Sequence, residues 1–386
     1  MYLGMELSAL EEKNAIHTAR EITQQPDLWQ NVWKEMNGHK PGLHKFLQTA
    51  LSTSKRIILT GAGTSAYIGI SLKGILQRRT GILTEDIATT DLVSHPRDFL
   101  HPEIPTLMIS FARSGNSPES AAAVSLTREI CKTSFHLVIT CNADGHLATH
   151  GPAENKYIFA LPPEANDQSL AMTSSYTGML LAGLLISQLD DLSAAKRSVD
   201  VLTGYGRRII DYYAPELAKV AALNFKRAVF LGSGPFFGTA KESHLKLQEL
   251  TDGRIICKQD SFLGFRHGPK AVIDDTTLVC YIFSNEEYVL KYEKDLVHSM
   301  RKGRAPLAEI GITENKLPGI DLDHIFYLSD NGCSLNEEFL AVCSVLPAQI
   351  LGFYKSLQLG LRPDTPSDTG AITRVVEGVQ IYDLKV

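Results

Sequence analysis

The feature that most constrains the fold is a short pattern that occurs twice. An apolar run ends in two glycines and is followed by a segment of helical periodicity. The first copy, RIILTGAG, begins at Arg56 and precedes a helical segment at 66–77; the second, AVFLGSGP, begins at Ala228 and precedes one at 238–250. The distance between the copies is far longer than a solenoid repeat, so the pattern indicates a duplicated domain.

Apolar runs and helical segments keep alternating after both copies. Strand-like runs follow at 105–111 and 135–140 in the first copy, and at 276–283 and 325–328 in the second. Continuous apolar, β-branched strands that alternate with helices are typical of parallel sheets covered on both faces. We therefore predict an α/β protein with two doubly wound parallel-sheet domains of the flavodoxin-like, three-layer type, preceded by an N-terminal helical segment.

The two copies also set the predicted domain boundaries. A length of 386 residues is ordinary for two to three domains. We expect a helical segment at 1–45, a first α/β domain at 46–200, a helical connector at 201–225, and a second α/β domain with the C-terminal tail at 226–386. One long apolar helix is predicted near the end of the second domain, at 337–359.

Composition excludes several classes of protein. The formal net charge is −5 and no run of Lys or Arg stands out, which argues against a nucleic-acid partner or an anionic membrane surface. The N-terminus lacks the pattern of a signal peptide, and the most apolar stretch, 178–186, is too short to span a bilayer. We therefore predict a cytoplasmic protein. The six cysteines form no C-x-x-C pair and are expected to be buried, reduced thiols: Cys131, Cys141, Cys257, Cys280, Cys333 and Cys343.

The turn after the first strand contains two glycines and two hydroxyls, in the order Gly61-Ala62-Gly63-Thr64-Ser65. Glycines let the backbone come close to a ligand, and the N-terminus of the next helix offers N–H groups to an anion. The turn lacks the third glycine of a dinucleotide fingerprint and the lysine of a P-loop. From these residues alone, a phosphate site and a tight turn with a Ser/Thr helix cap both stay open.

The loop after the next strand, SFARSGNSPES, is also rich in hydroxyls. Loops at the carboxyl ends of neighbouring parallel strands converge on one crevice, so Ser114 and Ser117 can face the anion that the first turn would hold. Together the loops predict a phosphate cradle with little formal charge, although Ser117 could serve only as a helix cap. Thr173 and Ser174 either complete this cradle or cap the helix that follows them.

The second copy carries acid–base residues instead. Glu242, Lys246 and Glu249 lie on one face of its first helix, which is typical either of a solvated salt-bridge ladder or of a buried site. His267 lies in the sequence RHGP, where glycine and proline fix the backbone around it. No metal site is predicted, because the paired aspartates lack histidines at ligand spacing: Asp190-Asp191, Asp274-Asp275 and Asp321-x-Asp323.

Together these motifs resemble the sugar isomerase (SIS) domain family. GAGTSAYIG and SFARSGNSPES are similar to its phosphate-loop signatures, and GSGPFFGTAKESHLKLQELTDG and FLGFRHGP are similar to the second half of tandem SIS isomerases. The resemblance covers roughly residues 45–385. AMTSSYTGM and DTPSDTGAITRVVEGVQIY favour the AgaS-type branch, described as tagatose-6-phosphate ketose/aldose isomerases or galactosamine-6-phosphate deaminases.

The resemblance implies a role for each motif residue. Phosphate would be held by Gly63, Thr64, Ser65, Arg113, Ser114 and Ser117, with Thr173 and Ser174 as weaker candidates. Arg113 replaces a glutamine of related synthases and could grip phosphate or a ring hydroxyl with two hydrogen bonds. Glu249 would move a proton from C2 to C1 and His267 would open the pyranose ring, while Lys246 and Glu242 orient the site. Arg374 replaces a lysine of the synthases, and its permanent charge favours charge stabilisation over amine chemistry.

The predicted reaction converts D-galactosamine 6-phosphate to D-tagatose 6-phosphate and ammonia through an enolamine, without a cofactor. Plain aldose–ketose isomerisation of a hexose 6-phosphate is the first alternative. A non-catalytic sugar-phosphate sensor is the second, although 1–45 shows no helix-turn-helix. A glutamine-dependent synthase is not expected, because Met1 is followed by Tyr2 rather than by a nucleophilic cysteine. In related isomerases the histidine reaches the neighbouring subunit, which implies a homodimer or dimer of dimers with a shared active site.

Overall fold

The computed structural model describes residues 1–386 except 331, 333, 376–377 and 385–386. The chain forms two compact units, each assembled from separate stretches of sequence. Unit A comprises Leu28–Asp167, Ser174–Lys196 and Gly370–Val386, and unit B comprises Met1–Asp27, Gln168–Thr173 and Arg197–Thr369. Compactness alone does not delimit a family domain, so the contiguous boundaries expected from the sequence stay a prediction.

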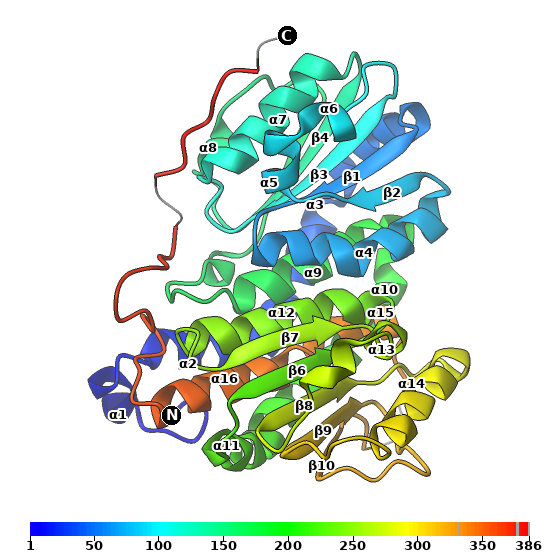
Figure 1. The fold of residues 1–386 in the computed structure, drawn as a ribbon. Helices are drawn as coiled ribbons and strands as arrows, with labels where there is room; N and C mark the ends of the chain where they lie inside the picture. Colours follow the sequence, from blue (N-terminus) through cyan, green and yellow to red (C-terminus); the bar gives the residue numbers. More distant parts are fainter. Residues whose placement is uncertain (331, 333, 376–377, 385–386) are drawn as a thin grey trace. The chain divides into compact units, whose positions relative to one another are not determined.

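Unit A contains a parallel five-stranded sheet in the order β2-β1-β3-β4-β5 (Figure 1). Its strands are β1 (Arg56–Thr60), β2 (Leu83–Asp86), β3 (Thr106–Ala112), β4 (Ser134–Thr140) and β5 (Lys156–Ala160). The helices around it are α3 (Gln25–Thr53), α4 (Thr64–Thr80), α5 (Thr89–Ser94), α6 (Pro96–Phe99), α7 (Pro118–Ile130), α8 (His146–Thr149) and α9 (Ser174–Ile186).

The core of unit A lies between this sheet and its helices. All seven residues of β3 are buried, as expected for a central strand covered on both faces. Ile58 and Met108 of the sheet pack in one cluster with Leu92 and Ala123 of the helices. Every residue of α9 is buried, which explains why that helix is apolar all round.

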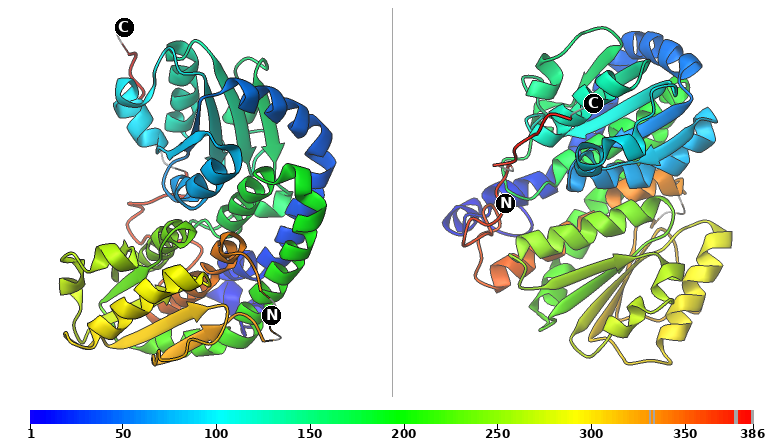
Figure 2. Two further views of the ribbon diagram at one scale, coloured as in Figure 1. Left: turned by 90° about the vertical axis from the view of Figure 1, so that its right-hand side faces the viewer. Right: turned by 45° about the horizontal axis from the view of Figure 1, so that its top comes forward.

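Unit B repeats the same topology, with a parallel sheet in the order β10-β9-β8-β6-β7. Its strands are β6 (Arg227–Leu231), β7 (Ile256–Asp260), β8 (Thr277–Ile282), β9 (Ala308–Thr313) and β10 (His324–Tyr327). Its helices are α1 (Leu7–Glu12), α2 (Ile16–Thr23), α10 (Leu192–Arg208), α11 (Ala214–Ala222), α12 (Pro235–Leu250), α13 (Phe262–Phe265), α14 (Glu287–Met300), α15 (Glu337–Cys343) and α16 (Leu346–Gln358). Helices lie on both faces of each sheet (Figure 2). The predicted fold, two doubly wound parallel sheets with a helical N-terminal segment, is confirmed.

The strand order places one topological switch point in each unit. In unit A the chain leaves β1 in one direction, toward β2, and returns on the other side at β3; β6 and β8 stand in the same relation in unit B. Ligands of doubly wound sheets bind at the carboxyl ends of the strands that flank such a point. The loops after β1 and β3, and those after β6 and β8, are therefore where a site is expected.

The apolar segment predicted as one helix at 337–359 is two helices. The prediction was wrong at one place: α15 ends at Cys343 and α16 begins at Leu346. Pro347 has no N–H to donate to the carbonyl of Cys343, so the regular helix is interrupted there. Among the described residues this segment, Glu337–Gln358, is long and apolar enough to cross a membrane, but 89% of its most apolar window is buried, as in the core helix of a globular unit.

The described cysteines are free thiols. Cys131, Cys141, Cys280 and Cys343 are buried and Cys257 is partly exposed, while Cys333 lies outside the described residues. Burial raises the pKa of Cys131 and Cys141 above the ordinary value, so both stay protonated and unreactive. The prediction of buried free thiols is confirmed for Cys131, Cys141, Cys280 and Cys343, whereas Cys257 is a free thiol that is partly exposed.

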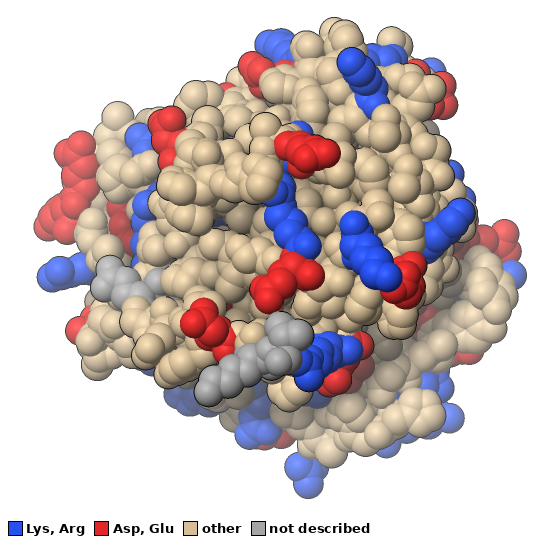
Figure 3. All heavy atoms as spheres, turned by 90° about the horizontal axis from the view of Figure 1, so that it is seen from above, with Lys and Arg blue, Asp and Glu red and all other residues tan. Residues whose placement is uncertain are grey.

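Charged side chains of both signs are interspersed on the face of the molecule drawn in Figure 3. Basic side chains lie beside acidic ones, and neither sign forms a large area of its own. A nucleic-acid-binding face would gather its Lys and Arg side chains into a patch or stripe. This face has no such footprint.

Candidate active site

The glycine turn of unit A is shaped for a close approach of backbone. Gly63 has a positive φ of 55°, and a Cβ at Gly61 would lie 2.7 Å from the carbonyl carbon of Ser65. Both positions therefore need glycine. Gly63 is also the N-cap of α4, so no side chain at the cap covers the first N–H groups of a 17-residue helix. Thr64 and Ser65, the first residues of that helix, are buried at this end.

The second hydroxyl loop of unit A follows β3. Ser117 is the N-cap of α7: its Oγ accepts the N–H of Ser120 at 3.3 Å and donates to the Ser120 hydroxyl at 2.7 Å. The Oγ of Ser114 accepts the N–H of Asn116 at 3.2 Å. Asn142, which the sequence did not single out, donates from Nδ2 to the carbonyl of Ser114 at 2.9 Å and holds the loop.

These two loops lie at the same edge of the sheet. β1 and β3 are adjacent and parallel, with Thr60 in register with Ser110, so the chain leaves both strands at neighbouring points. The structure therefore brings the predicted phosphate residues to one switch point. Gly63, Thr64 and Ser65 come from one side, and Arg113, Ser114 and Ser117 from the other.

Arg113 and Arg374 connect this switch point with the C-terminal tail. Arg113 is 7% exposed, and its guanidinium donates to the backbone carbonyl of Arg374. The guanidinium of Arg374 in turn donates from Nε to the carbonyl of Asp167 at 2.9 Å and from Nη2 to Oδ1 of Asn166 at 3.1 Å. Arg374 is thus held by hydrogen bonds to Arg113, Asn166 and Asp167.

The hydroxyl cluster at the start of α9 is organised by an acid that the sequence analysis missed. The carboxylate of Asp167 accepts the N–H groups of Ser174 and Ser175 at 3.1 and 2.9 Å, and the Ser175 hydroxyl at 2.5 Å. Asp167 therefore caps the start of α9. An acidic residue a few positions before an apolar helix was the available signal.

In unit B, the helix face with two glutamates and a lysine is buried. The Nζ of Lys246 lies 3.2 Å from Oε1 of Glu242 and 2.7 Å from Oε2 of Glu249. The side chains of Lys246 and Glu242 are 0% exposed and that of Glu249 is 24% exposed. Burial alone would lower the pKa of Lys246, but the attraction and hydrogen bonds of the two carboxylates outweigh it and raise that pKa. The solvated-ladder alternative is excluded, because a permanent ammonium is buried between two acids.

His267 is exposed in a loop that is itself well anchored. Ser261 caps the short helix α13, and its Oγ accepts the N–H of Gly264 at 3.0 Å. The backbone N–H of His267 donates to the carbonyl of Gly264 at 3.0 Å, and Gly268 has a φ of 111°. The imidazole is therefore presented to solvent from a fixed backbone.

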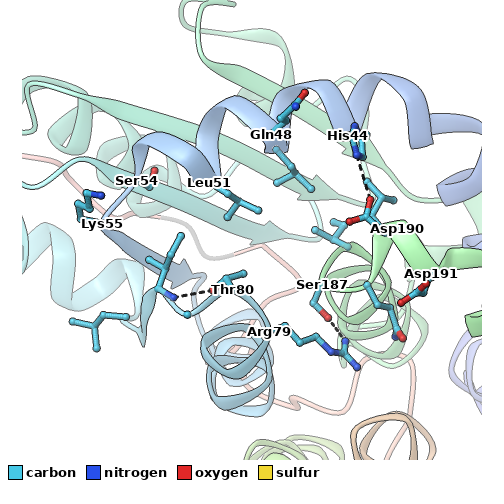
Figure 4. Close-up of a pocket in the computed structure, with 17 residues that line it drawn as sticks. His44, Gln48, Leu51, Ser54, Lys55, Arg79, Thr80, Ser187, Asp190 and Asp191 are labelled. Carbon is cyan, nitrogen blue, oxygen red and sulfur yellow. Dashed lines mark hydrogen bonds and ion pairs between the residues drawn. The ribbon is translucent and has the colours of Figure 1, made fainter.

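A cavity of about 830 Å³ lies at the opposite edge of the unit A sheet (Figure 4). It is lined by Lys55, which precedes β1, and by Leu83, the first residue of β2, so it lies at the amino ends of the strands. His44 and Asp190 face each other across part of it, 3.2 Å apart. None of the predicted site residues lines this cavity. Ligands of doubly wound sheets bind at the carboxyl ends, so we do not assign the cavity to the reaction.

The described residues contain no group of three or more His, Cys, Asp or Glu side chains placed to hold a metal ion. Two of the paired aspartates, Asp274 and Asp323, instead accept hydrogen bonds from the backbone. Oδ1 of Asp274 accepts the N–H of Thr276 at 3.0 Å, and Oδ2 of Asp323 accepts the N–H of Glu309 at 2.8 Å. Both carboxylates therefore stabilise the local backbone.

Comparison with known proteins places the chain in a family. The SIS domain profile matches residues 50–187, which include both hydroxyl loops of unit A. The D-galactosamine-6-phosphate deaminase AgaS of Shewanella sp. (strain ANA-3) is 39% identical over 98% of this chain and 95% of its own length. The chain belongs to the SIS domain family.

Solved structures extend the similarity of this SIS protein to its whole length. A protein from Clostridium novyi NT has a TM-score of 0.95 at 39% identity, covering 100% of this chain and 99% of that chain. The tagatose-6-phosphate ketose/aldose isomerase of Escherichia coli has a TM-score of 0.86 at 34% identity, covering 96% of this chain and 97% of that chain. Both units of the SIS protein therefore have counterparts in its relatives.

Proposed function

We propose that this SIS protein is an amino-sugar-phosphate deaminase/isomerase that converts D-galactosamine 6-phosphate and water to D-tagatose 6-phosphate and ammonia. The observation that carries the proposal is the buried Glu242–Lys246–Glu249 network, in which one carboxylate stays accessible. The names of relatives at high coverage support the substrate class: galactosamine-6-phosphate deaminase and tagatose-6-phosphate isomerase.

In this proposal unit A binds the phosphate. The N–H groups at the start of α4, which no side chain caps, and the hydroxyls of Thr64, Ser65 and Ser114 offer donors to a dianion at the switch point. Arg113 adds positive charge on a guanidinium that already holds the tail at Arg374. The cradle needs few formal charges, because buried donors and a helix N-terminus stabilise an anion efficiently.

The residues of unit B carry the proton transfers. His267 opens the pyranose ring, which requires moving a proton between the ring oxygen and the C1 hydroxyl. Glu249 then removes the C2 proton while O1 takes up a proton from water, which gives the enolamine. Glu249 returns its proton to C1 and the nitrogen releases one to water, which leaves an imine at C2. Water adds to that imine and ammonia leaves, so that C2 becomes the ketone. Lys246 keeps its own proton and holds the Glu249 carboxylate in place.

The test offers the purified protein a panel of galactosamine, glucosamine, galactose and glucose 6-phosphates. Ammonia is followed by a coupled assay and the ketose phosphate by NMR. Ammonia and tagatose 6-phosphate should form in equal amounts from galactosamine 6-phosphate. Ketose from a neutral sugar without ammonia from any amino sugar would favour plain isomerisation. Tight binding without turnover of any sugar would favour the sensor and contradict the enzyme.

We further propose a cytoplasmic homodimer or dimer of dimers whose subunits share active sites. The exposure of His267 on an anchored loop supports this, since such a side chain is free to serve a neighbouring subunit. The test mixes two inactive variants, Glu249→Gln and His267→Ala, after separate purification and exchange of subunits. Shared sites predict recovery of about a quarter of wild-type activity, because half of the dimers are mixed and carry one intact site each. No recovery despite confirmed exchange would contradict the shared site.

A further inference from the structure

The glycine turn of unit B repeats the backbone of the phosphate turn of unit A. Gly234 has φ 56° and ψ −127°, and Gly63 has φ 55° and ψ −127°. A Cβ at Gly232 would lie 2.4 Å from the carbonyl oxygen of Phe236, much as one at Gly61 would collide with the next turn of its helix. Gly234 is the N-cap of a 16-residue helix, α12. Unit B therefore keeps the backbone of an anion cradle.

The difference lies in what the cradle contains. Glu337 is the first residue of α15, and its Oε2 accepts the hydroxyl of Ser284 at 2.7 Å. Ser284 belongs to the loop after β8, on the other side of the switch point from the glycine turn. The second oxygen, Oε1, lies 3.9 Å from where a Cβ of Gly234 would be. One carboxylate thus spans the two loops between which unit A would hold phosphate.

The position of Glu337 in the chain topology also supports its place between these two loops. In unit A the helix that follows the fifth strand of the sheet begins with Ser174, in the hydroxyl cluster that could complete the phosphate cradle. In unit B the helix that follows the corresponding strand, β10, begins with Glu337. A carboxylate therefore stands in unit B where unit A has hydroxyls.

A second acid, Glu293, contacts the same serine as Glu337. Glu293 of α14 is 0% exposed; its Oε2 accepts the backbone N–H of Ser284 at 2.8 Å, while Oε1 has no hydrogen-bond partner among the described residues. Burial raises the pKa of Glu293 to about 8, and the charge of Glu337 contributes to that rise. Near neutral pH Glu293 is therefore mostly protonated.

We propose that Glu337 is an internal substitute for phosphate, which fills the cradle of unit B and leaves the chain with phosphate binding in unit A alone. A carboxylate and a phosphate both accept from hydroxyls and are both stabilised by a helix N-terminus. Glu337 also repels any second anion. Shortening its side chain removes both the occupant and the charge, and uncovers a latent site for inorganic phosphate in unit B.

The test uses inorganic phosphate as the probe, in a full-length background with the unit A cradle disabled by Ser65→Ala and Ser114→Ala. Calorimetric titration and ³¹P NMR measure binding. Adding Glu337→Ala should lower the phosphate dissociation constant at least about tenfold, with one phosphate bound per chain. Glu337→Gln should bind no better than the background, because the amide still fills the space.

Glu287→Ala is the matched control. Glu287 is an acid at the start of α14, but its side chain is 88% exposed and lies 3.1 Å from Lys291. Circular dichroism and thermal unfolding establish that each variant is folded, and Glu337→Ser replaces Glu337→Ala if the latter is not. A folded Glu337→Ala or Glu337→Ser variant that gains no phosphate binding would overturn the proposal, as would equal binding by Glu287→Ala. The readout involves no sugar and no turnover, so its failure leaves the proposed reaction untouched.

Discussion

Units A and B have the same strand order and the same glycine turn, yet their polar residues differ. At its switch point unit A carries hydroxyls, helix N–H groups and an arginine. At the corresponding place unit B carries Ser284 between two carboxylates, Glu293 and Glu337. The two units thus share the backbone of the glycine turn and differ in the charge of the side chains around it.

The same contrast holds for the helices after the two glycine turns. In α4 the residues at the start of the helix, Thr64 and Ser65, are the functional candidates. In α12 the corresponding positions are Pro235 and Phe236, and the candidates Lys246 and Glu249 lie in its last two turns. The candidate residues therefore lie at the first turn of the helix in unit A and in the last two turns of the helix in unit B.

The largest effect is expected for Glu249→Gln. The amide cannot accept a proton, so exchange of the C2 hydrogen with solvent should fall by about 10³-fold or more, while the affinity for substrate changes little. NMR in D₂O measures the exchange and calorimetry the affinity. Glu287→Gln, which removes an exposed acid of the same unit, should leave both unchanged. Exchange near the wild-type rate in Glu249→Gln would remove Glu249 from the reaction and break the division of labour between the units.

Lys246→Met should destabilise the protein strongly. It removes the ammonium that balances Glu242 and Glu249 inside unit B, and breaking a buried ion pair from one side costs about 3–5 kcal/mol of unfolding free energy. Urea denaturation measures the loss. Lys291→Met breaks a lysine–glutamate pair in which both side chains are mostly exposed, and should cost less than about 0.5 kcal/mol. Equal losses in the two variants would show that burial does not distinguish these networks.

Glu293 should make the stability of the protein depend on pH. Its pKa is about 8 in the folded state, against an ordinary value of 4.5, so the folded state keeps a proton that the unfolded state releases. Stability is therefore highest below pH 4.5 as far as this group is concerned, falls by up to about 1.4 kcal/mol per pH unit toward pH 8, and changes no further above it. In Glu293→Gln, urea denaturation between pH 6 and 8 should show a weaker decline than in wild type. Identical slopes in both proteins would contradict the buried, protonated state.

Most central strands could be predicted from the sequence, but the central strand β9 was missed, because Glu309 and Gly311 interrupt its apolar run. β1, β3, β4, β6 and β8 were expected from continuous apolar runs, which central parallel strands require. β2 and β7 lie at sheet edges, are short and partly exposed, and read LTED and ICKQD, so their sequences show no such run. Their pairing depends on a neighbouring strand, which a local pattern cannot reveal.

For the site, the sequence predicted single residues and their spacing but not the contacts between them. The spacing of Glu242, Lys246 and Glu249 correctly put them on one helix face, but only the structure shows that the lysine is buried between the acids. Asp167 was missed because its cap crosses a turn between η1 (Pro163–Ala165) and α9, and its role depends on how that turn folds. The predicted substrate roles of these residues stay predictions.

Asp167→Ala tests how far the unit A cradle depends on this one cap, and its expected effect is the smallest. The variant loses three hydrogen bonds to Ser174 and Ser175 at the start of α9, which should cost about 1–2 kcal/mol of stability. Ser117→Ala, which removes the neutral cap of α7, should cost about 1 kcal/mol or less. Thermal denaturation measures both.

The backbone carbonyl of Asp167 still accepts from Arg374 in the variant, so the tail should stay in place and phosphate binding should weaken less than in Arg113→Ala. An equal loss of phosphate binding in Asp167→Ala and Arg113→Ala would instead make the start of α9 a third component of the cradle. Unit A would then resemble unit B, where Glu337 reaches the cradle from the corresponding helix.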